Sequence, residues 1–196
     1  MRVETSTVAR LGSLQSFQQQ LAQRLQNAQK SNRSAKSYLA CATGRQRWLF
    51  DLTHTDEILG GEQPTPIPFT RDWYLGLVSH RGQLIGVIDL EGFAGADPKP
   101  WQQSDRLLAL SSTLPVPCAI RVTQMIGVID QAHLNPAHFN PAHFNPAHFN
   151  PKVPSTTPPS WAPHSFNHSD GSHYFGVDLL MLMAQPSFLD IAQYPA

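Results

Sequence analysis

The chain has 196 residues, of which 41% are hydrophobic and only 14% are charged, and its 14 basic residues equal its 14 acidic residues in number. This length predicts one domain or two small ones. A formal net charge of zero argues against general binding to nucleic acids or to acidic membranes. The two cysteines, Cys41 and Cys118, are too few for a disulfide framework, so we expect reduced, buried thiols in a cytosolic protein.

The first 47 residues carry much of the positive charge. They hold eight of the 14 basic residues and one acidic residue, which gives this segment a net charge of +7 and leaves −7 on the remainder. Apolar residues recur here at three- and four-residue steps, as on one face of a helix: Leu11, Leu14, Phe17, Leu21 and Leu25. We predict an N-terminal extension, residues 1–36, with an amphipathic helix that packs on its own domain, docks on a partner or serves as a transit peptide.

The sequence shows no recognisable signal for export or membrane insertion. Residues 1–36 are rich in Gln, Ser and Arg and lack the apolar core of a secretory signal. The strongly apolar runs fall far short of the ~20 residues that cross a bilayer. We therefore expect a cytoplasmic protein.

Residues 37–130 have the pattern of short strands separated by turns. Ser37–Thr43 and Gln46–Leu52 flank a turn at Gly44 and predict a hairpin. Three further strands are predicted at Gln83–Leu90, Arg106–Ser111 and Cys118–Thr123. This spacing favours a small all-β barrel or sandwich.

Two heptapeptides in this region are nearly identical, Gln83–Asp89 and Gln124–Asp130. A duplicated barrel half would produce such an echo. Chance reuse of apolar strand residues would produce it as well, and the sequence leaves both explanations open.

Residues 132–151 form a true repeat, Ala-His-Leu-Asn-Pro once and then Ala-His-Phe-Asn-Pro three times. A proline every five residues removes backbone donors and disfavours both helix and central strand. We predict a disordered or extended Pro/His-rich insertion at about 132–173. The repeat histidines could bind zinc, copper or nickel, but their spacing does not place ligands on one face, so we favour a passive spacer over a metal site: His133, His138, His143 and His148.

Ordered structure is predicted to resume after the insertion. Tyr174–Asp178 has the pattern of a strand, Asp178 can cap a short helix over Leu179–Ala184, and Pro186 suits the first turn of a helix that runs to Ala192. We therefore expect one domain, residues 37–196, interrupted by the insertion.

Catalytic motifs give little support to an enzyme. The sequence contains no Gly-x-Ser-x-Gly, Walker, Gly-x-Gly-x-x-Gly, His-Glu-x-x-His or Cys-x-x-Cys pattern. A pairing of Cys118 with His80 or His54 would rest only on their coexistence. We expect no enzymatic activity and no cofactor.

The segment Gly76–Leu90 resembles the signature of CheW-like domains, the coupling modules of chemotaxis, with its Gly-Leu-Val, its Arg-Gly turn and its Val-Ile-Asp-Leu strand. Flanking segments resemble the family in the same order, namely Trp48–Leu52, Asp56–Ile58, Thr65–Gly76, Asp105–Leu110 and Ala119–Val122. The resemblance covers roughly residues 37–130 and resumes near Tyr174. It implies an all-β fold with flanking helices, built of two small SH3-like five-stranded barrels.

The same resemblance implies a function. CheW-like proteins are non-enzymatic adaptors that bind the cytoplasmic tip of a methyl-accepting chemoreceptor and the regulatory domain of a CheA-like histidine kinase. The alternative is a His-repeat metal-binding or metal-sensing protein on a β-barrel scaffold. The Leu-rich N-terminal segment and the tail from Val177 to Ile191 resemble the PilI type, which acts in twitching motility driven by type IV pili.

The resemblance also implies site residues. Arg81, before Gly82 in a turn, is similar in place to an arginine that pairs with a glutamate, here Glu57, on the receptor-binding surface. Trp73 and Tyr74 are expected at an exposed edge, where aromatic side chains anchor partners. Asp89 is expected to cap a neighbouring turn and to belong to the partner-binding set.

Three positions depart from the family pattern. Ser79, Gly86 and Thr123 stand where the family usually has Asn, Pro and Asp.

Overall fold

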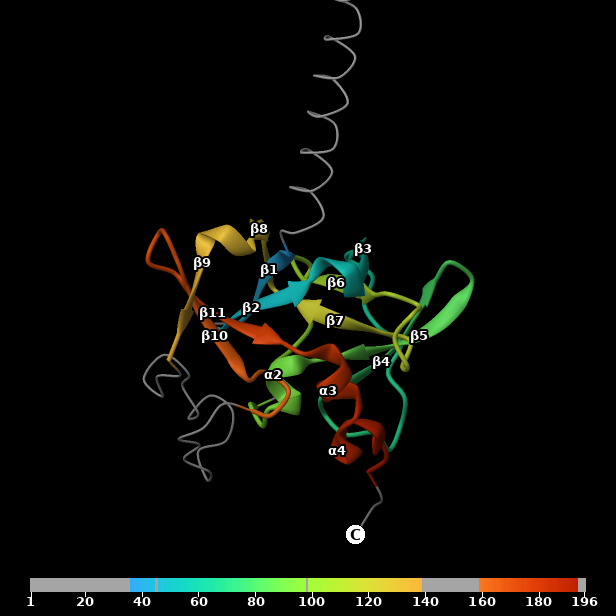
Figure 1. Cartoon of the computed structure of the whole chain (residues 1–196). Coiled ribbons are helices and arrows are strands. Elements are labelled where there is room, and N and C mark those ends of the chain that lie inside the picture. Colours follow the sequence, from blue (N-terminus) through green and yellow to red (C-terminus); the bar gives the residue numbers. More distant parts are fainter. Residues whose placement is uncertain (1–35, 45, 98, 139–158, 194–196) are drawn as a thin grey trace, which may run out of the picture. The chain divides into compact units, whose positions relative to one another are not determined.

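The computed structural model describes residues 36–44, 46–97, 99–138 and 159–193 (Figure 1). The predicted N-terminal helix and the repeat units that contain His143 and His148 lie outside these residues. No helix in the described ranges is long and apolar enough to cross a membrane.

Two sheets form the domain, in agreement with the predicted mainly β fold. The six-stranded sheet has the order β8-β1-β2-β11-β10-β9 and the five-stranded sheet the order β3-β6-β7-β5-β4. The strands of the first are β1 (Ser37–Thr43), β2 (Gln46–Asp51), β8 (Gln124–Asp130), β9 (Leu134–Ala137), β10 (His164–His168) and β11 (His173–Val177). Those of the second are β3 (Thr55–Gly60), β4 (Tyr74–His80), β5 (Gln83–Ile88), β6 (Arg106–Leu110) and β7 (Cys118–Val122).

The helices are short and lie at the ends of strands. They are η1 (Leu52–His54), α2 (Leu90–Phe93), η2 (Gln131–His133), α3 (Leu179–Met183) and α4 (Pro186–Leu189). Asp178 caps α3 by accepting a hydrogen bond from the Met181 N–H at 2.9 Å, as predicted. Pro186 begins α4 as predicted, but the helix ends at Leu189 and does not reach Ala192. Figure 1 shows α2, α3 and α4 grouped beside the two sheets.

The predicted β1–β2 hairpin is confirmed, with Thr43 opposite Gln46 and Tyr38 opposite Asp51. The other predicted strands are present within one or two residues of their expected bounds. Sequence patterns missed five strands, all of which are edge strands or lie next to one: β3, β4, β8, β9 and β10. Of these, β3, β9 and β10 contain too few apolar residues to be distinguished from loops.

Three apolar cores hold the domain together. The largest takes residues from both sheets and from the helices, including Trp48, Phe50, Ile88 and Ile120. A second is confined to the five-stranded sheet and its flanking residues, and a third to the six-stranded sheet. Each central strand thus contributes one face to the shared core and the other to its own sheet's core, which explains why β5 is buried on both faces from Ile85 onward.

The two sheets have the same topology. In each, a hairpin of adjacent strands (β1–β2, β6–β7) runs into a parallel partner (β11, β5), which pairs antiparallel with the preceding strand (β10, β4). In each, the first hairpin strand also pairs antiparallel with an edge strand (β8, β3) across a register shift. We call the five-stranded sheet with α2 the five-stranded half and the other the six-stranded half. The two halves are related by a circular permutation. β1 and β2 are the first strands of the six-stranded half along the chain, whereas their counterparts β6 and β7 are the last strands of the five-stranded half.

Local geometry supports this correspondence. After β5 and after β11 stands an aspartate that caps the next helix, Asp89 before α2 and Asp178 before α3. The N–H of each aspartate donates to a tryptophan carbonyl at 2.8 Å, that of Trp73 in one half and of Trp161 in the other.

A duplication is therefore visible in the fold, but the sequence echo did not locate it. Gln83–Asp89 contains β5, whose counterpart is β11, whereas Gln124–Asp130 is β8, whose counterpart is β3. The echo joins two strands that occupy different places in their sheets. The two strands also differ in burial, because β5 is mostly buried and β8 is mostly exposed, so a shared place in the core does not account for the echo.

The predicted insertion, residues 132–173, includes residues that belong to the six-stranded sheet. Residues 134–137 and 164–168 form β9 and β10, which pair with each other, and Trp161 between them is 4% exposed in the largest core. Pro136 is compatible with β9 because β9 is an edge strand, where a missing backbone donor costs no ladder bond. Only residues 139–158 of the predicted insertion lie outside the described structure.

Candidate partner-binding site

The turn between β4 and β5 presents Arg81 at the end of the five-stranded half. His80 pairs with Gln83, so Arg81 and Gly82 alone make the turn, with φ of 49° and 78°. Two consecutive residues with positive φ are the mark of a type I′ hairpin turn, which suits glycine at the second position. Arginine rarely adopts this backbone conformation. Strain of this kind is often found at functional sites.

Arg81 spans the two edges of its sheet. Its Nη1 lies 3.0 Å from Asp56 Oδ2 and its Nη2 lies 3.2 Å from Glu57 Oε2, and both carboxylates belong to β3, the opposite edge strand from β4. The five-stranded sheet therefore curls until its two edges meet at this guanidinium. The structure brings Arg81 and Glu57 together, the pair that the family resemblance implied.

Asp56 and His80 complete the cluster and were not predicted. The His80 Nε2 lies 3.4 Å from the Asp56 oxygen that also contacts Arg81. The register shift between Thr55 and Glu57 makes Asp56 the extra residue of a β-bulge, which lets neighbouring carboxylates face the same group. Adjacency to Glu57 and Arg81 in the sequence was the available signal for both residues.

This cluster contributes little to folding and is open to partners. The Arg81 side chain is 64% exposed, and exposed ion pairs stabilise proteins by only about 0–1 kcal/mol. Leu84, the second residue of β5, is 68% exposed, and Ile58 of β3 is also exposed. We call these six residues the Arg81 surface: Asp56, Glu57, Ile58, His80, Arg81 and Leu84.

The expectation that Trp73 lies at an exposed edge is wrong. Its side chain is 8% exposed, stacks on Phe188 with ring centroids 5.9 Å apart and meets Phe93 edge-on at 5.1 Å. Phe188 belongs to α4, so a helix far along the chain covers the Trp73 ring. Tyr74 is half-buried, and burial raises the pKa of its hydroxyl.

Asp89 caps the short helix α2 and is buried, which contradicts the expectation that it is available to a partner. Its Oδ1 accepts the N–H groups of Glu91 and Gly92 at 3.1 and 3.3 Å, and its Oδ2 lies 3.5 Å from Arg121 Nη1. All of these contacts are internal, so the observed role of Asp89 is structural.

Two of the departures from the family pattern have a local explanation. The Thr123 hydroxyl accepts the Gly44 N–H at 2.9 Å and donates to the Ala42 carbonyl at 3.1 Å, which fixes the β1–β2 turn. A Cβ at Gly86 would lie 2.9 Å from the Tyr74 ring, so a larger residue would displace that ring. Nothing in the structure explains Ser79.

The cysteines are buried among apolar residues, as predicted. Burial raises the pKa of the Cys41 and Cys118 thiols from 9.0 to about 12. Cys118 is therefore a poor nucleophile, because the thiolate is the reactive form.

This burial predicts that neither thiol reacts with a disulfide reagent in the native protein at mildly alkaline pH, and that both react once guanidinium chloride unfolds it. Ellman titration in the two conditions measures this. Unfolded thiols ionise near 9.0 and folded ones near about 12, so the free energy of unfolding falls as pH rises through that interval. Rapid reaction of one thiol in the native state would contradict the burial.

The described residues contain no group of three or more His, Cys, Asp or Glu side chains placed to hold a metal. Two of the four repeat histidines, His133 and His138, are described and exposed. The ring of His133 lies 6.3 Å from that of His168, which pairs with Asp170 at 2.9 Å. The fold thus brings one repeat histidine beside a non-repeat histidine.

A family model and a solved structure both match this chain. A family model described as the CheW-like domain matches residues 37–149. Among solved structures, the scaffolding protein TtCheW from Thermoanaerobacter tengcongensis is similar, with a TM-score of 0.58 and 18% identity over 78% of this chain and 94% of that one. That identity supports the fold alone. The search of curated proteins found no match. Because the family model spans more than half of the sequence, the chain belongs to the CheW-like domain family.

Proposed function

We propose that this protein is a non-enzymatic adaptor that couples a methyl-accepting chemoreceptor to a CheA-like histidine kinase. Membership of the CheW-like family supports a scaffold role in chemotaxis signalling. The adaptor would hold the receptor tip and the kinase regulatory domain together, so that receptor conformation biases the populations of kinase states.

The observation that carries the proposal is the Arg81 surface. It combines an arginine in a strained turn, two carboxylates and a histidine that contact one another, and two exposed apolar side chains. Charged groups around an apolar contact are typical of interfaces that select partners. Since the Arg81 side chain is 64% exposed, its ion pairs add little to stability, and its guanidinium is accessible to a partner.

Replacing Arg81 with alanine should leave the fold intact and weaken binding to the receptor tip or to the kinase regulatory domain at least about fivefold, because interface arginines often contribute more than 1 kcal/mol. Isothermal titration of the full chain with each cognate partner measures this. Arg81→Lys should fall in between, because an ammonium cannot fork onto both carboxylates.

Arg47 provides the matched control for Arg81. It is also an exposed arginine but lies on the six-stranded sheet, where it donates to the Ser172 hydroxyl at 2.6 Å. Arg47→Ala should bind both partners as the wild type does. Unchanged affinity of Arg81→Ala for both partners would remove the Arg81 surface from the proposal.

We further propose the type IV pilus pathway and the PilI type as the setting, on the support of the Leu-rich segment 11–25 and the tail Val177–Ile191. The protein would act in the cytoplasm and be recruited to membrane-associated receptor arrays through its partners. In this proposal residues 1–36 form an extension and residues 37–196 the interrupted domain. Co-purification with the pilus-pathway kinase and not with a flagellar one tests the assignment.

A further inference from the structure

One pair of equivalent positions in the two halves carries side chains of opposite charge. Arg121 in β7 stands opposite Leu107 of β6, as Asp51 in β2 stands opposite Tyr38 of β1. The duplication therefore places an arginine at the end of one half and an aspartate at the same end of the other. The helix-capping aspartates Asp89 and Asp178 are equivalent too, and each follows the strand parallel to the one that carries this residue.

In the five-stranded half, the guanidinium of Arg121 fills this end of the sheet. Its Nε and Nη2 donate to Asp105 Oδ2 at 2.9 and 2.6 Å. Its remaining donors reach the carbonyls of Lys99 and Pro100 at 2.8 and 2.6 Å, and it lies 5.5 Å from the centroid of the Trp101 ring. Only 4% of the residue is exposed.

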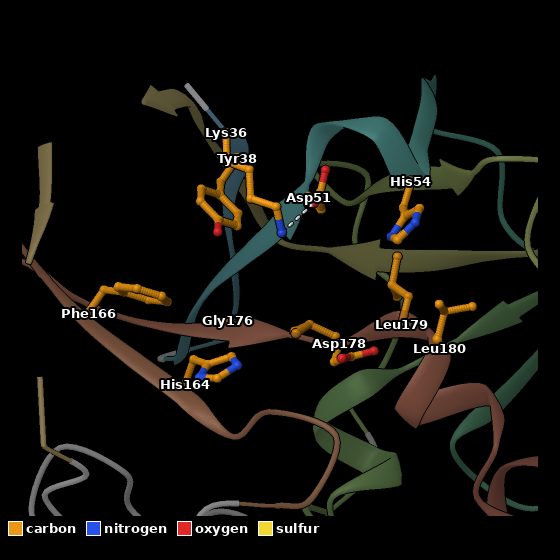
Figure 2. A pocket seen from close by; sticks show the side chains of 11 residues that line it. Lys36, Tyr38, Asp51, His54, His164, Phe166, Gly176, Asp178, Leu179 and Leu180 are labelled. Atoms are coloured by element: carbon orange, nitrogen blue, oxygen red, sulfur yellow. Dashed lines mark ion pairs between the residues drawn. The ribbon is translucent and has the colours of Figure 1, made fainter. Parts of the chain in front are cut away.

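The same end of the six-stranded half holds a pocket of about 170 Å³ (Figure 2). Eleven residues line it: Lys36, Tyr38, Asp51, His54, His164, Phe166, Gly176, Val177, Asp178, Leu179 and Leu180. Figure 2 shows Asp51 and Asp178 on opposite sides of the opening, with Tyr38 and Phe166 to one side and His54 and Leu180 to the other. The pocket thus occupies the place that the Arg121 side chain fills in the other half.

Charge in the pocket favours a cation. Asp51 is balanced by Lys36, whose Nζ lies 3.3 Å away. Asp178 uses its Oδ1 to cap α3, as Asp89 uses its Oδ1 to cap α2. In the five-stranded half the second oxygen of Asp89 lies 3.5 Å from a guanidinium nitrogen, and within the described residues Asp178 has no such cationic partner.

The walls fit a flat cation. The Tyr38 and Phe166 rings have centroids 6.2 Å apart, and both line the pocket, as Trp101 flanks Arg121 in the other half. Guanidinium groups stack on aromatic faces and fork onto carboxylates, whereas ammonium groups act as point charges. The volume of about 170 Å³ is below the roughly 300–1,000 Å³ of pockets that enclose whole ligands, and it suits a single side chain.

We infer that this pocket receives an arginine side chain of a protein partner, with the guanidinium between Asp178 and Asp51 and against the Tyr38 and Phe166 rings. The five-stranded half provides the internal precedent, because there a guanidinium of the chain itself fills the equivalent position. The inference does not depend on the Arg81 surface, which lies in the other half.

The test titrates the full ¹⁵N-labelled chain with N-acetyl-arginine amide and, in parallel, with the neutral citrulline analogue, by NMR at constant ionic strength. The expected result is saturable shifts at the amides of Gly176, Asp178 and Leu179 with the arginine probe only. Equal shifts with citrulline, or no shifts, would overturn the inference.

Two variants separate recognition from stability. Asp178→Asn should weaken binding of the arginine probe at least about fivefold, because a charge-assisted hydrogen bond is lost. Asparagine should still cap α3. Lys36→Gln should tighten binding, because it frees Asp51 for the ligand; a purely structural site would not respond in this way. Asp170→Asn, an exposed carboxylate in the β10–β11 turn, should bind as the wild type. Unchanged binding by Asp178→Asn would reject the site.

Discussion

Replacing Arg121 with alanine should lower the free energy of unfolding by about 3–5 kcal/mol, because removing one member of a buried ion pair leaves the other charge without compensation. Arg121 is 4% exposed. Its removal would leave Asp105, which is also buried, without its guanidinium and Asp89 without its facing charge. Urea unfolding followed by tryptophan fluorescence gives the number.

A neighbouring arginine provides the control. Arg106 is half-buried and donates to the carbonyls of Gln103 and Asp105 at 3.0 and 2.8 Å, so Arg106→Ala should cost at most about 1 kcal/mol. The double variant Arg121→Leu with Asp105→Leu should be more stable than Arg121→Ala, since no buried charge of that pair remains. A loss below about 1 kcal/mol for Arg121→Ala would show that water reaches the site.

The second large effect concerns Trp161, a residue that the sequence placed in a passive insertion. Its ring lies 5.4 Å from that of Trp48 and 6.1 Å from that of Phe93, and its carbonyl accepts the Asp178 N–H at 2.8 Å. Trp161→Ala should lower the free energy of unfolding by about 3–5 kcal/mol, as expected for a large aromatic removed from a core. Chemical denaturation with matched slopes measures the loss.

Phe69→Ala is the comparison for Trp161→Ala, because Phe69 is an aromatic residue that is 71% exposed. Its removal should change stability by no more than about 0.5 kcal/mol. If Trp161→Ala changed the free energy of unfolding as little as Phe69→Ala does, the residues before β10 would be a spacer and Trp161 would not belong to the core.

Local signals predicted the elements that depend on local chemistry. The β1–β2 hairpin follows from two apolar runs around a glycine turn, and the α3 cap follows from an aspartate before an apolar run. Trp73 and Trp161 were misplaced because what buries them, Phe188 in one case and Trp48 in the other, is more than 100 residues away in the chain. Single-residue patterns carry no information about such partners.

The sequence predicted only part of the candidate site, and it did so through the family resemblance. The pairing of Arg81 with Glu57 came from the family resemblance, not from the residues themselves. Asp56 and His80 join them through a bulge and a curled sheet, which depend on how β3 meets the β4–β5 turn. The equivalence of Arg121 and Asp51 was hidden because a circular permutation separates matching strands in the sequence.

The permuted strand order also determines when each half can fold during synthesis. All five strands of the five-stranded half lie between Thr55 and Val122, so that half can close as soon as this stretch leaves the ribosome. The β1–β2 hairpin is made first but must wait for β8 and β11, its neighbours on either side, and its unpaired edges stay exposed meanwhile. The five-residue repeats lie within the connection that must be synthesised before β11 arrives, so each added unit lengthens the interval in which the first-made strands remain unprotected.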